Sequence, residues 1–264
     1  HDLGHSPFGH AGEDALSDCL HQRGLPSFNH NLHTAKIVTV LERRYAAYDG
    51  LNLCWETLEG IAKHNGPVHG DLAADMERLF AGFDLELHTH ASAEAQVAAL
   101  SDDIAYNTHD VDDGLRAGLL DFAALADVAL PARALRDIDA KFPGLPADKR
   151  AFEVARRMIS ELIGDVLSNS RGLLAAFAGR GPEDIRAHET HVIAFSPGMY
   201  EDLQELRAFL FTNLYRHPQV NRRRHKTTKI IRDLFDLYDA RPDLLLSEKG
   251  MAEAMDDPVV RAGI

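Results

Sequence analysis

Three imidazoles and two carboxylates occur within the first thirteen residues of the chain, separated by glycine, proline and other small or apolar residues. They are His1, Asp2, His5, His10 and Glu13. Imidazole nitrogen and carboxylate oxygen are the ligands that borderline and hard divalent ions bind, so adjacent His1 and Asp2 could share one metal. His10 and Glu13 are three residues apart and therefore share a face of the following helix. We interpret this stretch as half of a metal site beside an acid–base pair.

A second group of polar side chains interrupts an otherwise apolar helix pattern at 101–110. Asp102, Tyr106 and Asp110 recur at every fourth residue, so they lie along one face of that helix. A helix that directs two carboxylates and a phenol to the same side borders a polar cavity. This second group weighs against the simpler interpretation of the N-terminal stretch as a glycine-containing turn that enters a helix.

Five longer segments follow one another along the chain. They are HDLGHSPFGHAGE, FNHNLHTAKIV, ETLEGIAKHNGP, SDDIAYNTHDVDD and NLYRHPQVNRRRHKTTKIIRDLF. In this order they resemble the HD-domain deoxynucleotide triphosphohydrolases, specifically the bacterial deoxyguanosinetriphosphate triphosphohydrolase-like proteins. The resemblance implies an all-α fold, the HD-domain helical bundle, and hydrolysis of a dNTP to deoxynucleoside and inorganic triphosphate.

The resemblance also implies a divalent metal ion, which could be Mn, Mg, Fe, Co, Ni or Zn. The ligands implied within this chain are His1, Asp2 and Asp102. The family's remaining ligand is a His on a helix upstream of the His-Asp pair, and the family continues beyond Ile264 into one more helix. We therefore expect residues 1–264 to be a single HD-type helical domain that lacks the N-terminal and C-terminal helices of the full-length protein, and to bind metal weakly and turn over little substrate on its own.

The remaining site residues receive roles from the same resemblance. His10, oriented by Glu13, is expected to move a proton to or from the reacting oxygens, a role worth roughly 10² to 10⁴ in rate. His5 and His30 are expected to meet the substrate's phosphates. Tyr106 is expected to pack against the deoxyribose where a 2′-hydroxyl would crowd it, and Asp110 to accept a hydrogen bond from the 3′-hydroxyl.

A basic run near the C-terminal end contains no acidic residue, in a chain whose formal net charge is −13. Its members are Arg216, Arg222, Arg223, Arg224, Lys226, Lys229 and Arg232. One interpretation is a solvated basic face. The other is neutralisation of a triphosphate, at the substrate pocket or at a second, regulatory dNTP site, and we select Arg216 and Lys226 as candidate substrate-binding residues.

Composition narrows the class of protein. With 264 residues, 45% of them hydrophobic, the chain can bury a sizeable core as one unit. No apolar run approaches the roughly 18 residues that span a bilayer, and two cysteines without metal-ligand spacing suit a reducing cytoplasm. The acidic balance argues against general nucleic-acid affinity, although the basic run leaves a local site open. We therefore expect a cytoplasmic protein, and the family resemblance implies a homo-oligomer.

Several amphipathic helices must position these residues. Apolar periodicity predicts helices over 11–22, 30–48, 53–64, 91–116, 148–178, 199–216 and 220–239. Phe152 is expected in the buried stripe of the helix over 148–178, and Asp103 on the solvated side of its own helix. Lys63, near a helix end, is expected to complement the helix dipole, with a role on the substrate side as the alternative.

Two other function classes remain open at this point. One is another HD-domain nucleotide phosphohydrolase, such as a phosphodiesterase or monophosphatase, which would not release free triphosphate. The other is an inactive HD module that binds a nucleotide or a nucleic acid without turnover.

Overall fold

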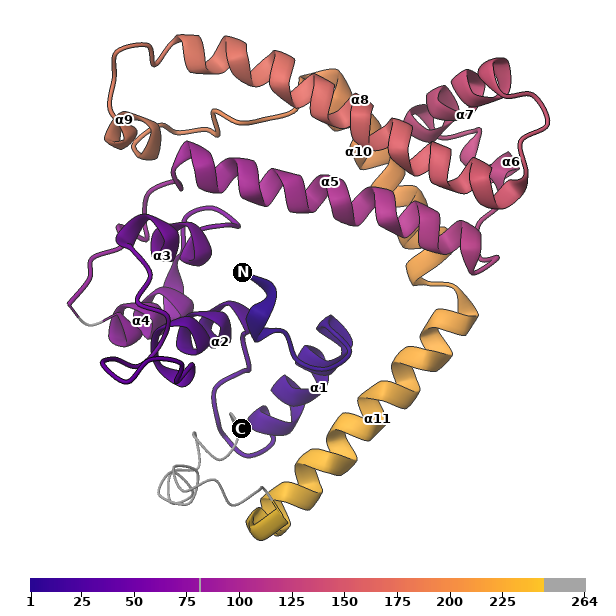
Figure 1. Cartoon of the computed structure of the whole chain (residues 1–264). Helices are drawn as coiled ribbons and strands as arrows, with labels where there is room; N and C mark the ends of the chain where they lie inside the picture. The colour runs from indigo at the N-terminus through magenta and orange to yellow at the C-terminus, as the bar shows by residue number, and fades with distance from the viewer. Residues whose placement is uncertain (81, 245–264) are drawn as a thin grey trace. The chain divides into compact units, whose positions relative to one another are not determined.

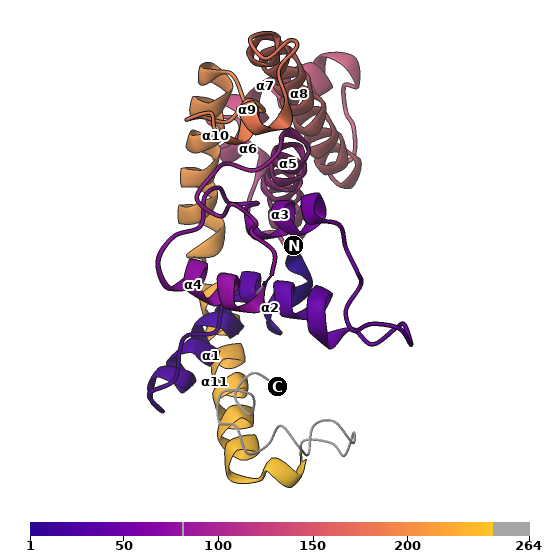
Figure 2. The same cartoon turned by 90° about the vertical axis from the view of Figure 1, so that its left-hand side faces the viewer.

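The fold is all-α, as the resemblance implies. A computed structural model describes residues 1–80 and 82–244, and within these ranges helices are joined by loops with no β-strand. An isolated bridge pairs Tyr45 with Tyr48. Figures 1 and 2 show the helices with their labels. None of the helices described is long and apolar enough to span a lipid bilayer.

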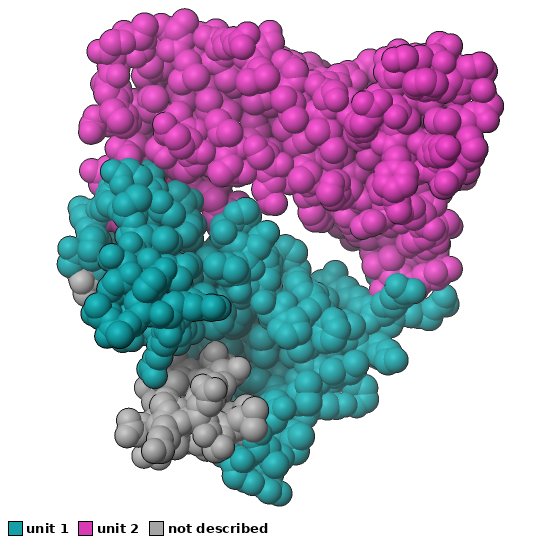
Figure 3. Space-filling view, in the orientation of Figure 1, with its two compact units in different colours: residues 1–62, 70–84, 221–264 teal, residues 63–69, 85–220 magenta. Residues whose placement is uncertain are grey.

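The chain divides into two compact units, which Figure 3 colours separately. Unit 1 draws its described residues from 1–62, 70–84 and 221–264, and unit 2 comprises 63–69 and 85–220. The expectation of one HD-type domain over 1–264 stays a prediction.

Unit 1 contains the N-terminal motifs on short helices. Its elements are the 3-10 helix η1 (Asp2–Gly4), α1 (His10–His21), α2 (His30–Lys36), the π-helix η2 (Ile37–Leu41), α3 (Trp55–Ala62), α4 (Gly70–Leu79), most of α11 (Pro218–Ala240) and η4 (Pro242–Leu244). The helix predicted over 30–48 therefore ends at Leu41. Beyond it the chain doubles back, and the N–H groups of Gly50 and Leu51 donate to the carbonyls of Glu42 and Val38, at 2.7 and 2.8 Å.

A buried threonine attaches the His-Asp turn to α2. The Gly4 N–H donates to the Thr34 hydroxyl oxygen at 2.9 Å, and this hydroxyl donates to the His1 carbonyl at 2.5 Å. The two backbones are in close contact, because a Cβ on Gly4 would lie 2.2 Å from the Thr34 nitrogen and 2.3 Å from the His30 oxygen. The first residues of the chain are thereby held against the helix that carries His30.

Unit 2 is a bundle of longer helices around an apolar core. Its elements are α5 (Ala93–Arg116), α6 (Phe122–Leu125), α7 (Ala129–Lys141), α8 (Ala147–Ala175), α9 (Pro182–Arg186), α10 (Pro197–Leu210) and the π-helix η3 (Phe211–Tyr215). α5 lies alongside α8 in both Figure 1 and Figure 2. Completely buried core residues include Val111 of α5, Ile138 of α7, Leu206 of α10, and Met158 and Leu162, which are four residues apart on α8 and therefore share one face.

One sequence-based expectation about burial is wrong. Phe152 lies outside the core with 56% of its surface exposed, and the Arg116 guanidinium lies 3.9 Å above its ring. Lys63 directly follows the last residue of α3 and is only 1% exposed, and its role toward the helix dipole stays a prediction. Its ammonium donates to the Thr89 hydroxyl at 2.8 Å and to the carbonyls of Glu86 and His90 at 3.2 and 3.1 Å, so it holds the loop before α5.

The close approach at Gly4 yields a stability prediction. Gly4→Ala should lower the free energy of unfolding by about 1–3 kcal/mol, because the new methyl group forces backbone apart in a packed region. The measurement is urea denaturation followed by circular dichroism. Gly164→Ala is the matched control, since no atom lies within 4 Å of the added Cβ on α8, and it should be neutral or stabilising. Equal stability of the Gly4 variant and the wild type would contradict the close contact.

Candidate active site

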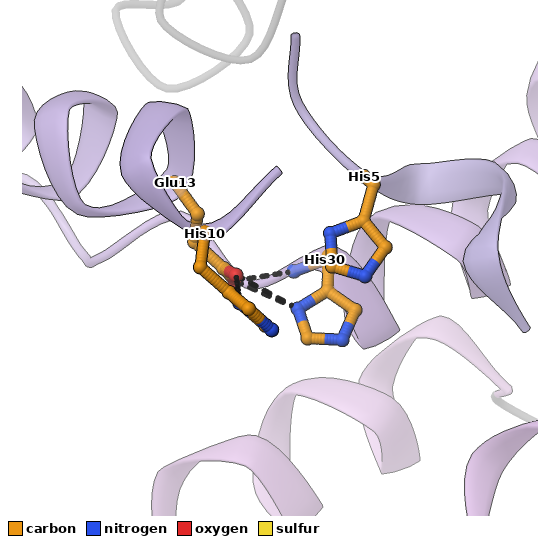
Figure 4. A group of neighbouring side chains, drawn as sticks. All are labelled: His5, His10, Glu13 and His30. Atoms are coloured by element: carbon orange, nitrogen blue, oxygen red, sulfur yellow. Dashed lines mark hydrogen bonds and ion pairs between the residues drawn. The ribbon is translucent and has the colours of Figure 1, made fainter. Parts of the chain in front are cut away.

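The Glu13 carboxylate brings together the histidines of α1 and α2 (Figure 4). It lies 3.2 Å from His10 Nδ1 and 2.9 Å from His30 Nδ1, and it accepts the His30 backbone N–H at 3.0 Å. An ionised carboxylate only accepts, so both rings donate from Nδ1. Their Nε2 atoms are then left to meet other groups.

Local sequence explains how the two helices deliver these side chains. α1 begins at His10, directly after Gly9, whose φ of 56° lies in the region that favours glycine. α2 begins at His30 because Asn29 caps it, its Oδ1 accepting from the N–H groups of Asn31 and Leu32 at 3.0 and 3.1 Å. Glu13 thus meets the first turn of α2, where its negative charge is also favoured by the helix dipole.

His5 completes a cluster of three imidazoles. Its ring stacks on that of His30 with centroids 4.0 Å apart and planes 11° apart, and the His10 ring lies edge-on at 5.2 Å. Burial lowers the pKa of His5, and electrostatic repulsion from the neighbouring His30 lowers it further. His5 is therefore a neutral donor or acceptor at neutral pH, rather than a cation.

The pKa of Glu13 is set by opposing effects. Burial raises it, but hydrogen bonds from the His30 side chain and backbone and from His10 outweigh burial and bring the pKa below its usual value. Glu13 is consequently ionised at neutral pH and can hold both imidazoles.

The His-Asp pair lies at the edge of this cluster. His1 Nε2 is 3.2 Å from Asp2 Oδ1, and His5 Nε2 is 3.6 Å from the same oxygen. Asp2 is exposed, so its carboxylate retains room for a further ligand.

The donor atoms of unit 1 suit a divalent ion. His5, His10, Glu13 and His30 each offer a ligand atom, all within 4.8 Å of one another. The buried His5 Nδ1 has no hydrogen-bond partner in the described part of the chain. Imidazole and carboxylate together match Mn, Fe, Co, Ni or Zn. The sequence assigned the metal to His1, Asp2 and Asp102 instead. Asp102 is exposed on α5 in unit 2, and its place in the ligand set stays a prediction.

In unit 2, Asp110 belongs to a hydrogen-bonded group that includes one residue not selected from the sequence. The Tyr215 hydroxyl donates to Asp110 Oδ2, and the Tyr215 ring lies 6.4 Å from that of Tyr106. Burial raises the pKa of Asp110, and hydrogen bonds from Tyr215 and Tyr106 partly counteract it. Burial and Asp110 also raise the pKa of Tyr215, which stays protonated.

Asp103 is also partnered, contrary to its predicted solvated position. Its two carboxylate oxygens accept from Arg207 of α10. The Arg207–Asp103 pair and the Tyr215–Asp110 hydrogen bond therefore connect α5 to the α10–η3 segment at two different positions along α5.

The basic run has more than one role. Arg224 and Arg232 of α11 pair with Asp14 and Asp18 of α1 at 2.6 and 2.7 Å, and Lys229 pairs with Asp233 at 2.5 Å. The two arginines therefore join α11 to the helix that carries His10 and Glu13, whereas the Lys229 pair lies within α11.

The two members of the run that were selected as substrate-binding residues have different surroundings. The Arg216 guanidinium lies 4.4 Å over the Phe211 ring, and Lys226 is exposed. Their contact with substrate stays a prediction.

Comparisons with known proteins agree with the sequence motifs. Residues 193–261 match a family model described as a phosphohydrolase-associated domain. A protein of Cereibacter sphaeroides (strain ATCC 17025 / ATH 2.4.3) is 47% identical over 100% of this chain and 70% of its own length. A second, from C. sphaeroides (strain ATCC 17029 / ATH 2.4.9), is 49% identical over 94% of this chain and 65% of its own.

A third relative, from Ruegeria sp. (strain TM1040), is 50% identical over 90% of this chain and 62% of its own length. All three are named deoxyguanosinetriphosphate triphosphohydrolase-like protein. The chain thus spans 62% to 70% of the length of these curated relatives.

The Tyr215–Asp110 contact yields a prediction about ionisation. Tyr215→Phe should raise the carboxyl titration midpoint of Asp110, because it removes a donor that favours the ionised form, and should lower the free energy of unfolding by about 1–3 kcal/mol. Carboxyl ¹³C NMR and urea denaturation measure the two effects. Tyr200→Phe, an exposed tyrosine of α10, is the control. An unchanged or lower midpoint would rule out the hydrogen bond in solution.

Proposed function

Because the chain belongs to the family of deoxyguanosinetriphosphate triphosphohydrolase-like proteins, we propose that it hydrolyses deoxynucleoside triphosphates to deoxynucleoside and inorganic triphosphate. The observation that carries this proposal is the Glu13 carboxylate shared by His10 and His30 beside the His1–Asp2 pair. Such a group combines ligands for a divalent ion with an oriented imidazole for proton transfer.

In this reaction water attacks the α-phosphorus and the bond to the 5′ oxygen breaks. The hydroxyl of water remains on triphosphate, and a proton reaches the 5′ oxygen of the deoxynucleoside. Glu13 fixes the His10 ring through Nδ1, so Nε2 is the atom that gives or takes this proton. The proposed role of His10 follows from its exposed ring, since a proton-transfer group has to reach substrate.

The other residues of the site bind and orient the substrate. His5, neutral at neutral pH, hydrogen bonds to phosphate oxygens, and His30 does so from the Nε2 that faces away from Glu13. Asp110 accepts from the 3′-hydroxyl, and Tyr106 packs where a 2′-hydroxyl would crowd it. Tyr215 is a positioning residue, because its hydroxyl orients the Asp110 carboxylate. Arg216 and Lys226 contribute positive charge toward the triphosphate.

A divalent ion completes the proposal. His1, Asp2 and Asp102 would hold it, and when bound it neutralises phosphate charge and lowers the pKa of water. We further propose a cytoplasmic homo-oligomer, with a regulatory dNTP as a second nucleotide partner.

The product pattern tests the reaction. The full-length protein is incubated with each dNTP in Mn²⁺ or Mg²⁺, and products are separated by anion-exchange chromatography. Equal amounts of deoxynucleoside and triphosphate are expected. Pyrophosphate or monophosphate products would favour another phosphohydrolase, and binding without turnover would favour an inactive nucleotide-binding module.

His10 and Glu13 provide a test of site roles. His10→Ala and Glu13→Gln should each lower kcat by about 10² to 10⁴, because proton transfer loses its oriented imidazole, while metal content stays unchanged. Inductively coupled plasma mass spectrometry measures the metal, and Glu77→Gln on the exposed side of α4 is the control. Loss of metal from either variant would assign the ligands to the histidine cluster rather than to His1, Asp2 and Asp102.

Tyr106 should discriminate between sugars. Tyr106→Ala is expected to reduce the ratio of kcat/KM for a dNTP over the matching rNTP, by about tenfold or more, since the space for a 2′-hydroxyl opens. Tyr200→Ala provides an exposed aromatic control. If kcat/KM falls by the same factor for the dNTP and the rNTP, the hypothesis that Tyr106 sterically excludes the 2′-hydroxyl is wrong.

A further inference from the structure

Unit 1 contains a cavity outside the residues assigned to the active site. Its volume is about 470 Å³, within the roughly 300–1,000 Å³ of small-molecule sites. The walls come from the end of α1, the loop before α2, α2 itself and α4. Leucines form much of the lining, namely Leu20, Leu25, Leu32 and Leu79. An apolar molecule of small size would therefore be desolvated there.

Charge on the walls is almost balanced. Arg78 pairs with Asp75, so these two residues contribute no net charge. Burial, and then the positive charge of Lys36, lowers the pKa of His33, which is neutral at neutral pH. Lys36 forms no ion pair in the described ranges of the chain, so its ammonium remains uncompensated at the cavity wall.

One wall also offers aromatic surface. The rings of Phe28 and His33 lie 5.5 Å apart at an angle of 49°. A flat apolar group can pack on such a surface.

We propose that this cavity binds a small amphipathic anion, with an aromatic or aliphatic body among the leucines and a single anionic group on Lys36. One uncompensated ammonium is too little for a triphosphate, which carries several negative charges. The ligand class is thus distinct from the proposed substrate. A carboxylate, sulfonate or phosphate monoester could each supply the anionic group.

The cavity shares α2 with the candidate active site. This helix has seven residues, His30 to Lys36. His30 at its first position bonds to Glu13, and Thr34 bonds to Gly4 and His1, while Leu32, His33 and Lys36 line the cavity. Asn29, which caps α2, also lines the cavity. A bound anion therefore contacts α2, the helix that positions His30. If the proposed function holds, binding of this anion regulates turnover.

Binding is tested without turnover, by calorimetry of the full-length protein with 1-naphthaleneacetate. Saturable binding at one site per chain is expected, with the neutral 1-naphthaleneacetamide and the Lys36→Met variant each about tenfold weaker, since each lacks one partner of a charge-assisted contact. Lys149→Met, at an exposed position of α8 outside the cavity, should bind like wild type. Leu25→Trp, which fills the cavity, should abolish binding while its circular dichroism stays unchanged.

Three results would overturn the site: no saturable binding, equal affinity for acid and amide, or equal affinity of wild type and Lys36→Met. The regulatory coupling is measured separately, as the change in kcat/KM for a dNTP on adding 1-naphthaleneacetate. A change of about twofold or more is expected, and it should be lost in Lys36→Met. Saturable binding with unchanged turnover would refute the coupling alone, and absence of any dNTP hydrolysis would refute the proposed function while leaving the binding result intact.

Discussion

The Glu13 carboxylate is the group on which the N-terminal site depends. It is largely withdrawn from water, and a charge in that position is tolerated only when it is fully hydrogen bonded. Its donors are His10 on its own helix and the ring and backbone of His30 on the next. One ionised group therefore fixes the distance between α1 and α2 and the tautomers of two imidazoles. The Thr34 hydroxyl extends the same constraint to η1, so the first residues of the chain are attached to α2 from a second side.

Sequence periodicity was sufficient to predict those features that depend only on residues close together along one helix. The spacing of His10 and Glu13 predicts their contact, and the apolar stripes predict α5, α8 and the α10–η3 segment to within a few residues. The contact between Glu13 and His30 is of another kind, because it crosses a loop whose path spacing does not determine. The family resemblance placed His30 in the site, but not its bond to Glu13.

Burial set by the tertiary fold explains the errors. The burial of Lys63 was not predicted, because the three oxygen atoms that compensate for its loss of water come from a later loop. Phe152 has the apolar character of a core residue, yet its ring supports the Arg116 guanidinium at the surface. Tyr215 and Arg207 lie far along the chain from their acidic partners, so no local pattern could pair them with Asp110 and Asp103.

Tyr215 is the last residue of the π-helical turn Phe211–Tyr215, which follows α10 directly. A π-turn contains one residue more than the corresponding α-helical turn, and each residue of an α-helix advances the side chain by about 100°. The extra residue is absorbed within the turn, so the residues on either side of it keep the faces that an uninterrupted helix would give them. The segment therefore directs Leu210 into the core and Tyr215 toward Asp110, although it holds one residue more than an α-helix of the same length.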